Sequence, residues 1–226
     1  MNRSAANIVR EYGPFPDVTN VAGVSYDGSK VWFACGDKLN AMDPASGTML
    51  RSLDVPSHAG TAFDGSHLFQ IYGDKIQKVD PESGRIVGTI PAPEGGCSGM
   101  AWAEGALWVA QHRRRKIHQV DPGTGNILRT IDSNRHVTGV TWVDGELWHG
   151  TWEGEESDLR RIDPRTGEVR EQIEMPRGVS VSGLESDGGA QFFCGGGNSG
   201  KVRAVRRPAR ATTDAGAIVR WRASIA

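Results

Sequence analysis

The chain repeats itself about every 40 residues, and this repeat restricts the possible folds more than any other feature. Each copy holds two recognisable phrases. The first is an acidic residue and a glycine before an apolar, aromatic run; its acidic residues are Asp27, Asp64, Glu104, Asp144 and Asp187. The second is Asp-Pro-x-Ser/Thr-Gly; its aspartates are Asp43, Asp80, Asp121 and Asp163. The first phrase occurs five times, at steps between 37 (Asp27 to Asp64) and 43 (Asp144 to Asp187), which indicates five copies of one unit.

Four short strands, called a to d in chain order, fit into each copy. Turns predicted at Asp27-Gly28 and Asp43-Pro44 separate them in the first copy. The strands themselves are predicted at residues 23–26, 31–35, 39–42 and 49–55. No segment has the sustained period of a helical repeat protein. Because four strands in about 40 residues are typical of a propeller blade, the sequence predicts an all-β fold, a five-bladed β-propeller of four-stranded blades.

The fifth copy lacks both the Asp-Pro turn and a clear strand d. A further strand is predicted at Ile8 to Tyr12, ahead of the first copy, and we expect it to supply the missing outer strand. An open ring would leave strand edges unpaired, so this strand is predicted to close the ring. Residues 1–208 are therefore predicted to form a single propeller domain. Residues 209–226 are predicted to be a C-terminal tail or an extra closing strand.

The composition excludes several classes of protein. The 226 residues carry 26 basic and 27 acidic side chains, for a net charge of −1, whereas a dedicated nucleic-acid binder is usually clearly basic. No stretch approaches the ~20 apolar residues that cross a bilayer, and the N-terminus lacks a secretory apolar segment. The three cysteines form no CxxC pair, which favours a reducing compartment. These features predict a cytoplasmic protein without nucleic-acid or membrane partners, and they leave its oligomeric state open.

The recurring acidic and aromatic residues are predicted to be structural. Asp-Gly favours a tight hairpin, and Asp-Pro-x-Ser/Thr-Gly favours a capped turn. Because these acidic residues are about 40 residues apart, one in each copy, they are not interpreted as a row of metal ligands. Aromatic residues recur at two positions of the repeat, where we expect them to pack between neighbouring blades. The two sets are Tyr26, Phe63, Trp102 and Trp142, and Trp32, Phe69, Trp108, Trp148 and Phe192.

Candidate site residues lie in the loops that differ between copies. The a–b and c–d turns are uniform, whereas the d–a and b–c loops, at the other face of a propeller, diverge, and divergence favours a site. The candidates for substrate binding are His58, Tyr72, Cys97, His112, Arg113, Arg135, Trp152 and Glu153. We expect the arginines to hold negative charge, and Trp152 and Tyr72 to form apolar walls. Cys97 is also a candidate nucleophile beside His136. The glycine-rich segment Cys194 to Gly200 is predicted to be a flexible loop.

Among the carboxylates, Glu185 is the strongest candidate for a catalytic residue. Its position in strand a is occupied by small residues in the other copies, namely Ser25, Ala62, Ala101 and Thr141. Strand a lines the central channel, where partial desolvation raises the pKa of a carboxyl group toward the range useful for acid–base chemistry. We predict Glu185 and His136 as catalytic residues, with His136 assisting proton transfer. The alternative for Glu185 is a structural carboxylate bonded within the channel.

The fourth copy, Val137 to Val169, resembles the propeller-type glutamine cyclotransferases. The residues that carry the resemblance are Trp142, Gly145, Trp148, Trp152, Ile162, Asp163, Pro164, Thr166 and Gly167. It implies five blades, an enzyme that modifies a small molecule or peptide, and a substrate-stacking role for Trp152. The acidic residue of that family falls on Thr141 and its asparagine on Gly150, whereas an acid stands in the same register one blade later, at Glu185.

Three functions remain open at this point. The first is a cyclotransferase-like enzyme with carboxylate and histidine acid–base chemistry at one propeller face. The second is a metal-assisted lyase. The whole chain is also similar to the wider virginiamycin B lyase superfamily, and this resemblance implies magnesium-assisted elimination. The third is a non-catalytic propeller that binds a protein or peptide. No dense His-x-x-x-His signature occurs, so no residue is assigned to a metal; the cofactor stays unknown, with magnesium possible.

Overall fold

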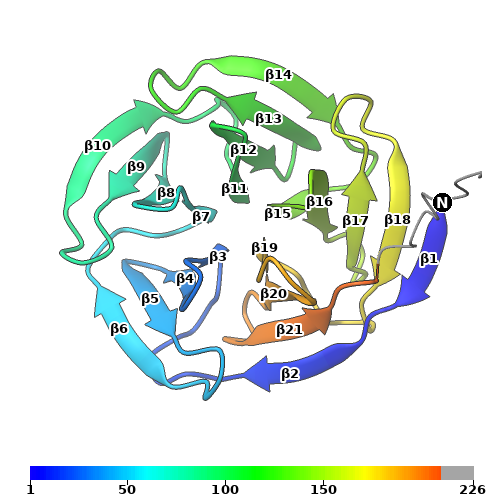
Figure 1. Cartoon of the computed structure of the whole chain (residues 1–226), viewed down its shortest axis with the longest axis horizontal. Helices are drawn as coiled ribbons and strands as arrows, with labels where there is room; N and C mark the ends of the chain where they lie inside the picture. Colours follow the sequence, from blue (N-terminus) through cyan, green and yellow to red (C-terminus); the bar gives the residue numbers. More distant parts are fainter. Residues whose placement is uncertain (210–226) are drawn as a thin grey trace, which may run out of the picture.

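The computed structural model describes residues 1–209, which form a ring of five β-sheets around one axis (Figure 1). Blade 1 consists of β3 (Val24–Tyr26), β4 (Val31–Cys35), β5 (Lys38–Met42) and β6 (Met49–Leu53). Blade 2 consists of β7 (Thr61–Phe63), β8 (Leu68–Tyr72), β9 (Lys75–Val79) and β10 (Ile86–Pro91). Blade 3 consists of β11 (Met100–Ala103), β12 (Ala106–Gln111), β13 (Lys116–Val120) and β14 (Ile127–Asp132).

The last two blades also use the N-terminus. Blade 4 consists of β15 (Val137–Val143), β16 (Glu146–Thr151), β17 (Asp158–Ile162), β18 (Val169–Glu174) and β1 (Asn2–Ala5). Blade 5 consists of β19 (Leu184–Ser186), β20 (Gln191–Gly195), β21 (Val202–Arg206) and β2 (Ile8–Tyr12). The predicted five-bladed all-β propeller is confirmed. The described residues contain no helix long and apolar enough to cross a bilayer.

The ring closes as the sequence predicts. β2 pairs antiparallel with β21, with Tyr12 opposite Val202, and so supplies the outer strand that the fifth copy lacks. β1 was not predicted. It adds to the outer edge of β18 as a parallel strand, with Asn2 opposite Glu171. All four β1 side chains are exposed, so this strand has no apolar pattern to reveal it. The tail predicted at 209–226 lies, from residue 210 onward, outside the described residues.

Glycines bring the five innermost strands together around the axis. The segments leading into β3, β7, β11, β19 and the start of β15 each contain one, namely Gly23, Gly60, Gly99, Gly183 and Gly139. A Cβ atom at any of these positions would lie 2.3 to 2.6 Å from the backbone of the next blade. The contacts run around the ring in order, from Gly23 to blade 2 and finally from Gly183 back to blade 1. We call these five residues the glycine ring; only glycine permits so close an approach.

Aromatic side chains fill the spaces between blades, as expected. Phe69 stacks on Trp102 between blades 2 and 3, with ring centroids 5.6 Å apart, and Trp108 stacks on Trp142 between blades 3 and 4 at 5.5 Å. Trp148 and Phe192 join blades 4 and 5 at 4.9 Å. Trp108 and Phe192 are fully buried. Between blades 5 and 1 the ring that meets Tyr26 is Phe193, at 5.6 Å, because the extra residue in the a–b turn of blade 5 shifts the predicted position from Phe192 to Phe193. The aromatic positions of the sequence thus join neighbouring blades.

The repeated aspartates cap turns. The Oδ1 atom of Asp121 accepts hydrogen bonds from the backbone N–H groups of Gly123 (3.0 Å) and Thr124 (2.8 Å). The hydroxyl and the N–H of Thr124 lower the pKa of Asp121 because they favour its charged form. Asp43 and Asp163 accept equivalent backbone bonds in their own blades. These carboxylates are therefore occupied by local donors, as the turn interpretation requires.

Candidate functional site

The divergent loops gather at one face of the ring and surround two adjoining cavities. The axial cavity, of about 270 Å³, lies immediately above the glycine ring. Its floor is formed by residues that precede the ring glycines, and its rim by side chains of the divergent loops. The lining residues are Asn20, Ala22, His58, Ala59, Cys97, Ser98, His112, Thr138, Ser182 and Gly197. The d–a and b–c loops therefore meet at one face, as the sequence predicts.

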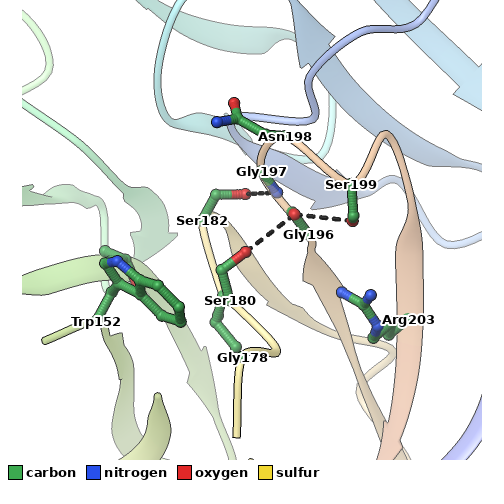
Figure 2. A pocket seen from close by; sticks show the side chains of 11 residues that line it. Trp152, Gly178, Ser180, Ser182, Gly196, Gly197, Asn198, Ser199 and Arg203 are labelled. Carbon is green, nitrogen blue, oxygen red and sulfur yellow. Dashed lines mark hydrogen bonds between the residues drawn. The ribbon is translucent and has the colours of Figure 1, made fainter. Parts of the chain in front are cut away.

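A second cavity, of about 540 Å³, opens between blades 4 and 5 (Figure 2). Trp152 forms one side of it, and the segments 178–182 and 196–199 and the side chain of Arg203 form the rest. Thr138, Ser182 and Gly197 line both cavities, so the two form one continuous depression. We call the second one the blade 4–5 cavity.

Two histidines and a glutamate form a connected group at the edge of the depression. The rings of His112 and His136 stack with centroids 4.7 Å apart. His136 Nδ1 lies 3.0 Å from the carbonyl oxygen of His112, which can only accept, so Nδ1 carries the hydrogen. His136 Nε2 lies 3.6 Å from Glu153 Oε1. The backbone N–H of Trp152 donates to the carbonyl oxygen of His136 (3.2 Å), which ties this group to the blade 4–5 cavity.

Electrostatics set the protonation of His112. Burial lowers its pKa below the usual 6.5, and electrostatic interactions with His136 and Arg113 lower it further. His112 is therefore neutral at pH 7, with a lone pair free to accept a proton. Glu153 is held beside the pair by two cations, since Arg115 Nη2 lies 2.6 Å from its Oε1 and Arg135 Nε lies 3.6 Å from its Oε2.

Two buried donors on the cavity walls have no hydrogen-bond partner within residues 1–209. One is the hydroxyl of Thr138, a residue with 6% of its surface exposed, which lines both cavities. The other is Nη1 of Arg203, which lines the blade 4–5 cavity. Buried polar groups are nearly always paired, so orphaned ones at a cavity indicate where a ligand binds. Neither residue was singled out from the sequence.

Glu185 lies on the other side of the glycine ring from the depression. In β19 it follows Gly183 by two residues and precedes the a–b turn, and it lines neither cavity. Its Oε1 accepts a hydrogen bond from Thr141 Oγ1 (2.5 Å) and its Oε2 one from Ser25 Oγ (3.3 Å). It thus bridges three blades through the register position identified in the sequence.

Burial raises the pKa of Glu185 from 4.5 to about 7, against the opposing effect of its hydrogen bonds. This agrees with the direction expected from the sequence. No hydrogen bond or ion pair joins Glu185 to His136 among residues 1–209, so the structure does not bring the two predicted catalytic residues together.

The remaining candidates are dispersed around the rim. His58, in the loop between blades 1 and 2, packs against Tyr72 at the end of β8, with ring centroids 5.0 Å apart. Arg113 is exposed, and the neighbouring Arg115 takes the contact with Glu153. Cys97 lines the axial cavity, and burial raises the pKa of its thiol to about 11. At neutral pH Cys97 is therefore a thiol rather than the reactive thiolate.

The described residues contain no grouping of metal-binding side chains large enough for a metal site. Among residues 1–209, no three His, Cys, Asp or Glu side chains are grouped so that they could hold a metal ion. The repeated turn aspartates accept local hydrogen bonds instead. No residue of the described part is therefore assigned to the magnesium of the lyase alternative.

Comparison with known proteins gives a family and a fold. A sequence family described as a repeat of unknown function (DUF6923) matches residues 60–205. The chain belongs to this family. A search of curated proteins found no match for this DUF6923 member. Among solved structures it is similar to glutaminyl cyclase of Myxococcus xanthus, with a TM-score of 0.74 and 18% identity, covering 91% of this chain and 97% of the other.

A second solved structure similar to this DUF6923 chain is hydrazine synthase of Kuenenia stuttgartiensis. The TM-score is 0.51 and the identity 18%, and the match covers 79% of this chain and 56% of the other. At such identities the similarities establish the propeller fold alone. The resemblance to glutamine cyclotransferases is thus supported at the level of architecture.

Proposed function

We propose that the protein is an enzyme that uses histidine acid–base chemistry in the depression of the divergent face, on a small molecule or peptide that carries an amine. The observation that carries this proposal is the arrangement of His112, His136 and Glu153. A neutral imidazole lines the axial cavity, a second imidazole stacks on it, and a carboxylate positions the second. An oriented base beside a cavity with unpartnered donors is the usual architecture of an acid–base site.

The proposed reaction class is cyclotransfer. The amine of an N-terminal glutaminyl group attacks its own side-chain amide carbon, so that a C–N bond forms, the original C–N bond breaks and ammonia leaves. The similarity in fold to glutaminyl cyclase of Myxococcus xanthus supports this class. The attacking nitrogen must lose a proton and the leaving nitrogen must gain one. His112 accepts the first proton because its lowered pKa keeps it neutral, and then returns it to the departing amine.

The neighbouring residues have defined tasks in this proposal. His136 donates through Nδ1 to the backbone of His112, and Glu153 stabilises positive charge on the stacked pair as the proton arrives. The unpartnered hydroxyl of Thr138 donates to the amide oxygen of the substrate, where negative charge develops. Trp152 forms the apolar wall. Glu185 lies beyond the glycine ring and therefore has no task in this mechanism. Its catalytic role stays a prediction.

The test is ammonia release and the corresponding mass loss from peptides with N-terminal glutamine. His112→Asn should lower kcat by about 100-fold to 10,000-fold, the range for losing a general base. His67→Asn is the matched control, because His67 lies in an a–b turn at the opposite face and should keep full activity. Activity retained by His112→Asn, or turnover lost on chelation and restored by magnesium, would contradict the proposed mechanism.

A non-catalytic propeller predicts a different result. The glutaminyl peptide would then be recovered unchanged at every pH, even where it binds. A flat apolar rim would favour such a binder, whereas this face carries two adjoining cavities lined by hydroxyl, imidazole and guanidinium groups. The cavities are the reason for preferring the enzyme.

A further inference from the structure

One position of the repeat carries a buried polar side chain in every blade. It is the residue directly after the first apolar residue of strand c. The side chains at this position are Asn40, Gln77, His118, Arg160 and Arg203. All five are at most 8% exposed. Burying a polar side chain is costly unless its hydrogen bonds are satisfied. The partners of each residue therefore show whether it has a structural role or awaits a ligand.

In blades 3 and 4 these side chains are satisfied within the protein. His118 bonds to Thr130 Oγ1 through Nδ1 (2.8 Å) and to Gln111 Oε1 through Nε2 (3.0 Å). Arg160 donates through Nε to Asp158 Oδ1 (2.7 Å), through Nη2 to Asp158 Oδ2 (3.1 Å) and through Nη1 to Asn134 Oδ1 (2.6 Å). Every nitrogen of the Arg160 guanidinium thus has a protein partner.

Arg203, the blade 5 counterpart of Arg160, is different. Its Nε donates to Glu11 Oε1 (2.6 Å), but Nη1 is buried without a partner within residues 1–209. Gln77 also has an unpartnered atom, but that atom is a carbonyl oxygen and Gln77 lines neither cavity. In Figure 2 the guanidinium of Arg203 points toward Gly196 and Ser199 at the wall of the blade 4–5 cavity.

The glycine-rich segment before β21 packs closely against this nitrogen. A Cβ atom on Gly196 would lie 2.6 Å from Arg203 Nη1, so any larger residue would crowd the guanidinium. This segment, expected to be a flexible loop, is held by a β-bridge and several hydrogen bonds. Gly197 forms a β-bridge with Val21, and the hydroxyls of Ser180 and Ser199 both donate to the carbonyl oxygen of Gly196, at 3.0 and 2.8 Å. The glycines therefore shape a cavity wall.

The charge around the cavity favours an anion. Glu11 is the carboxylate that accepts from Arg203, and it is shared with Lys201, whose Nζ lies 3.0 Å away. Two cations thus face one carboxylate. None of the residues that line the blade 4–5 cavity is acidic. A bound carboxylate would complete the pairing of the buried guanidinium, and charge-assisted bonds of this kind are the strong ones.

We propose that the blade 4–5 cavity binds the carboxylate of a ligand whose planar or apolar part lies against Trp152. The inference does not depend on the proposed reaction. A carboxylate fits better than a phosphate because few donors remain. Four backbone N–H groups of the segment 196–200 are already bonded, those of Gly196, Gly197, Ser199 and Gly200. The hydroxyls of Ser180, Ser182 and Ser199 also donate to backbone carbonyl oxygens. One guanidinium nitrogen and the hydroxyl of Thr138 therefore remain, which matches a singly charged group, whereas phosphate sites usually offer a nest of free N–H groups.

The test uses N-acetylphenylalanine and its uncharged amide as probes, with binding to the full chain followed by NMR shifts of the Trp152 indole N–H. The carboxylate form should bind roughly tenfold to a hundredfold more tightly than the amide, the range expected for one charge-assisted bond. Arg203→Met should abolish this preference. Equal affinity for the two probes, the absence of any shift with the carboxylate at millimolar concentration, or a preference unchanged in Arg203→Met would each overturn the proposal.

Two further variants keep the test valid if Arg203→Met does not fold. Glu11→Gln removes the carboxylate that competes for Arg203 and should strengthen binding of the probe by about twofold to fivefold. Gly196→Ala retains every charge but crowds Nη1 and should weaken binding of the carboxylate selectively. Gly196 does not have a positive φ, so the alanine can keep the same backbone conformation, although the Ser199 hydroxyl, 2.3 Å from the added Cβ, must also shift. Opposite changes in these two variants would also overturn the proposal.

Discussion

Replacing Glu185 by glutamine tests the energetics of the channel directly. The substitution preserves the size of the side chain, and its amide oxygen still accepts from Thr141 Oγ1 while its NH₂ group donates to Ser25 Oγ. It removes the ionisable proton alone. Any dependence of stability on pH that disappears in the variant therefore belongs to this carboxyl group.

The sign follows from the direction of the pKa change. Burial raises the pKa of Glu185 from 4.5 to about 7, so the folded protein retains a proton that the unfolded chain has lost between these values. The stability contributed by the neutral carboxyl is fully present below pH 4.5 and is lost as the pH rises to about 7. The gap corresponds to about 3.4 kcal/mol at 1.36 kcal/mol per pH unit. Because part of the Glu185 side chain is exposed, we expect about 2–3 kcal/mol.

The assay is urea unfolding of the wild type and Glu185→Gln at pH 4 and pH 8. Other groups titrate too; for example, the capped Asp121 loses its stabilising effect as the pH falls through its lowered pKa. Such contributions are common to both proteins and cancel in the comparison. Relative to the wild type, Glu185→Gln should gain about 2–3 kcal/mol in unfolding free energy between pH 4 and pH 8. A difference that is constant with pH would refute the reasoning.

Three further predictions concern the ring. Gly139→Ala places a Cβ atom 2.3 Å from the backbone nitrogen of Leu184 and should lower the unfolding free energy by about 1–3 kcal/mol in urea; an unchanged midpoint would show that the glycine ring is not tight. Removal of residues 1–12 takes away β2 and exposes the edge of β21, so aggregation should appear in size-exclusion chromatography. Removal of residues 1–5 takes away β1 alone and should leave a monodisperse protein. Trp142→Ala removes the ring stacked on Trp108 and should cost about 3–5 kcal/mol in unfolding free energy; a loss below 1 kcal/mol would argue against inter-blade packing as the main source of stability.

The fold was largely predictable because its determinants are local and repeated. Each Asp-Pro turn depends on bonds within a few residues, such as those from Asp121 to the N–H groups of Gly123 and Thr124. Each aromatic position packs against the next copy of the same pattern, as Trp108 does against Trp142. Even ring closure followed from a missing strand and an unassigned one. β1 escaped prediction because its bonds to β18 are made by the backbone, which carries no signature in the side chains.

The candidate site was harder to predict from the sequence because its residues come from different blades. The stacking of His112 on His136 depends on the relative rotation of blades 3 and 4, which no spacing along the chain reveals. A usable signal nevertheless existed for Arg203. The position after the first apolar residue of strand c is polar in all five copies, from Asn40 to Arg203, and buried in each. A repeat protein provides its own comparison set, so a polar residue recurring at a buried register identifies a hydrogen-bonding position. The copy whose partners are missing is then the one to examine for a ligand.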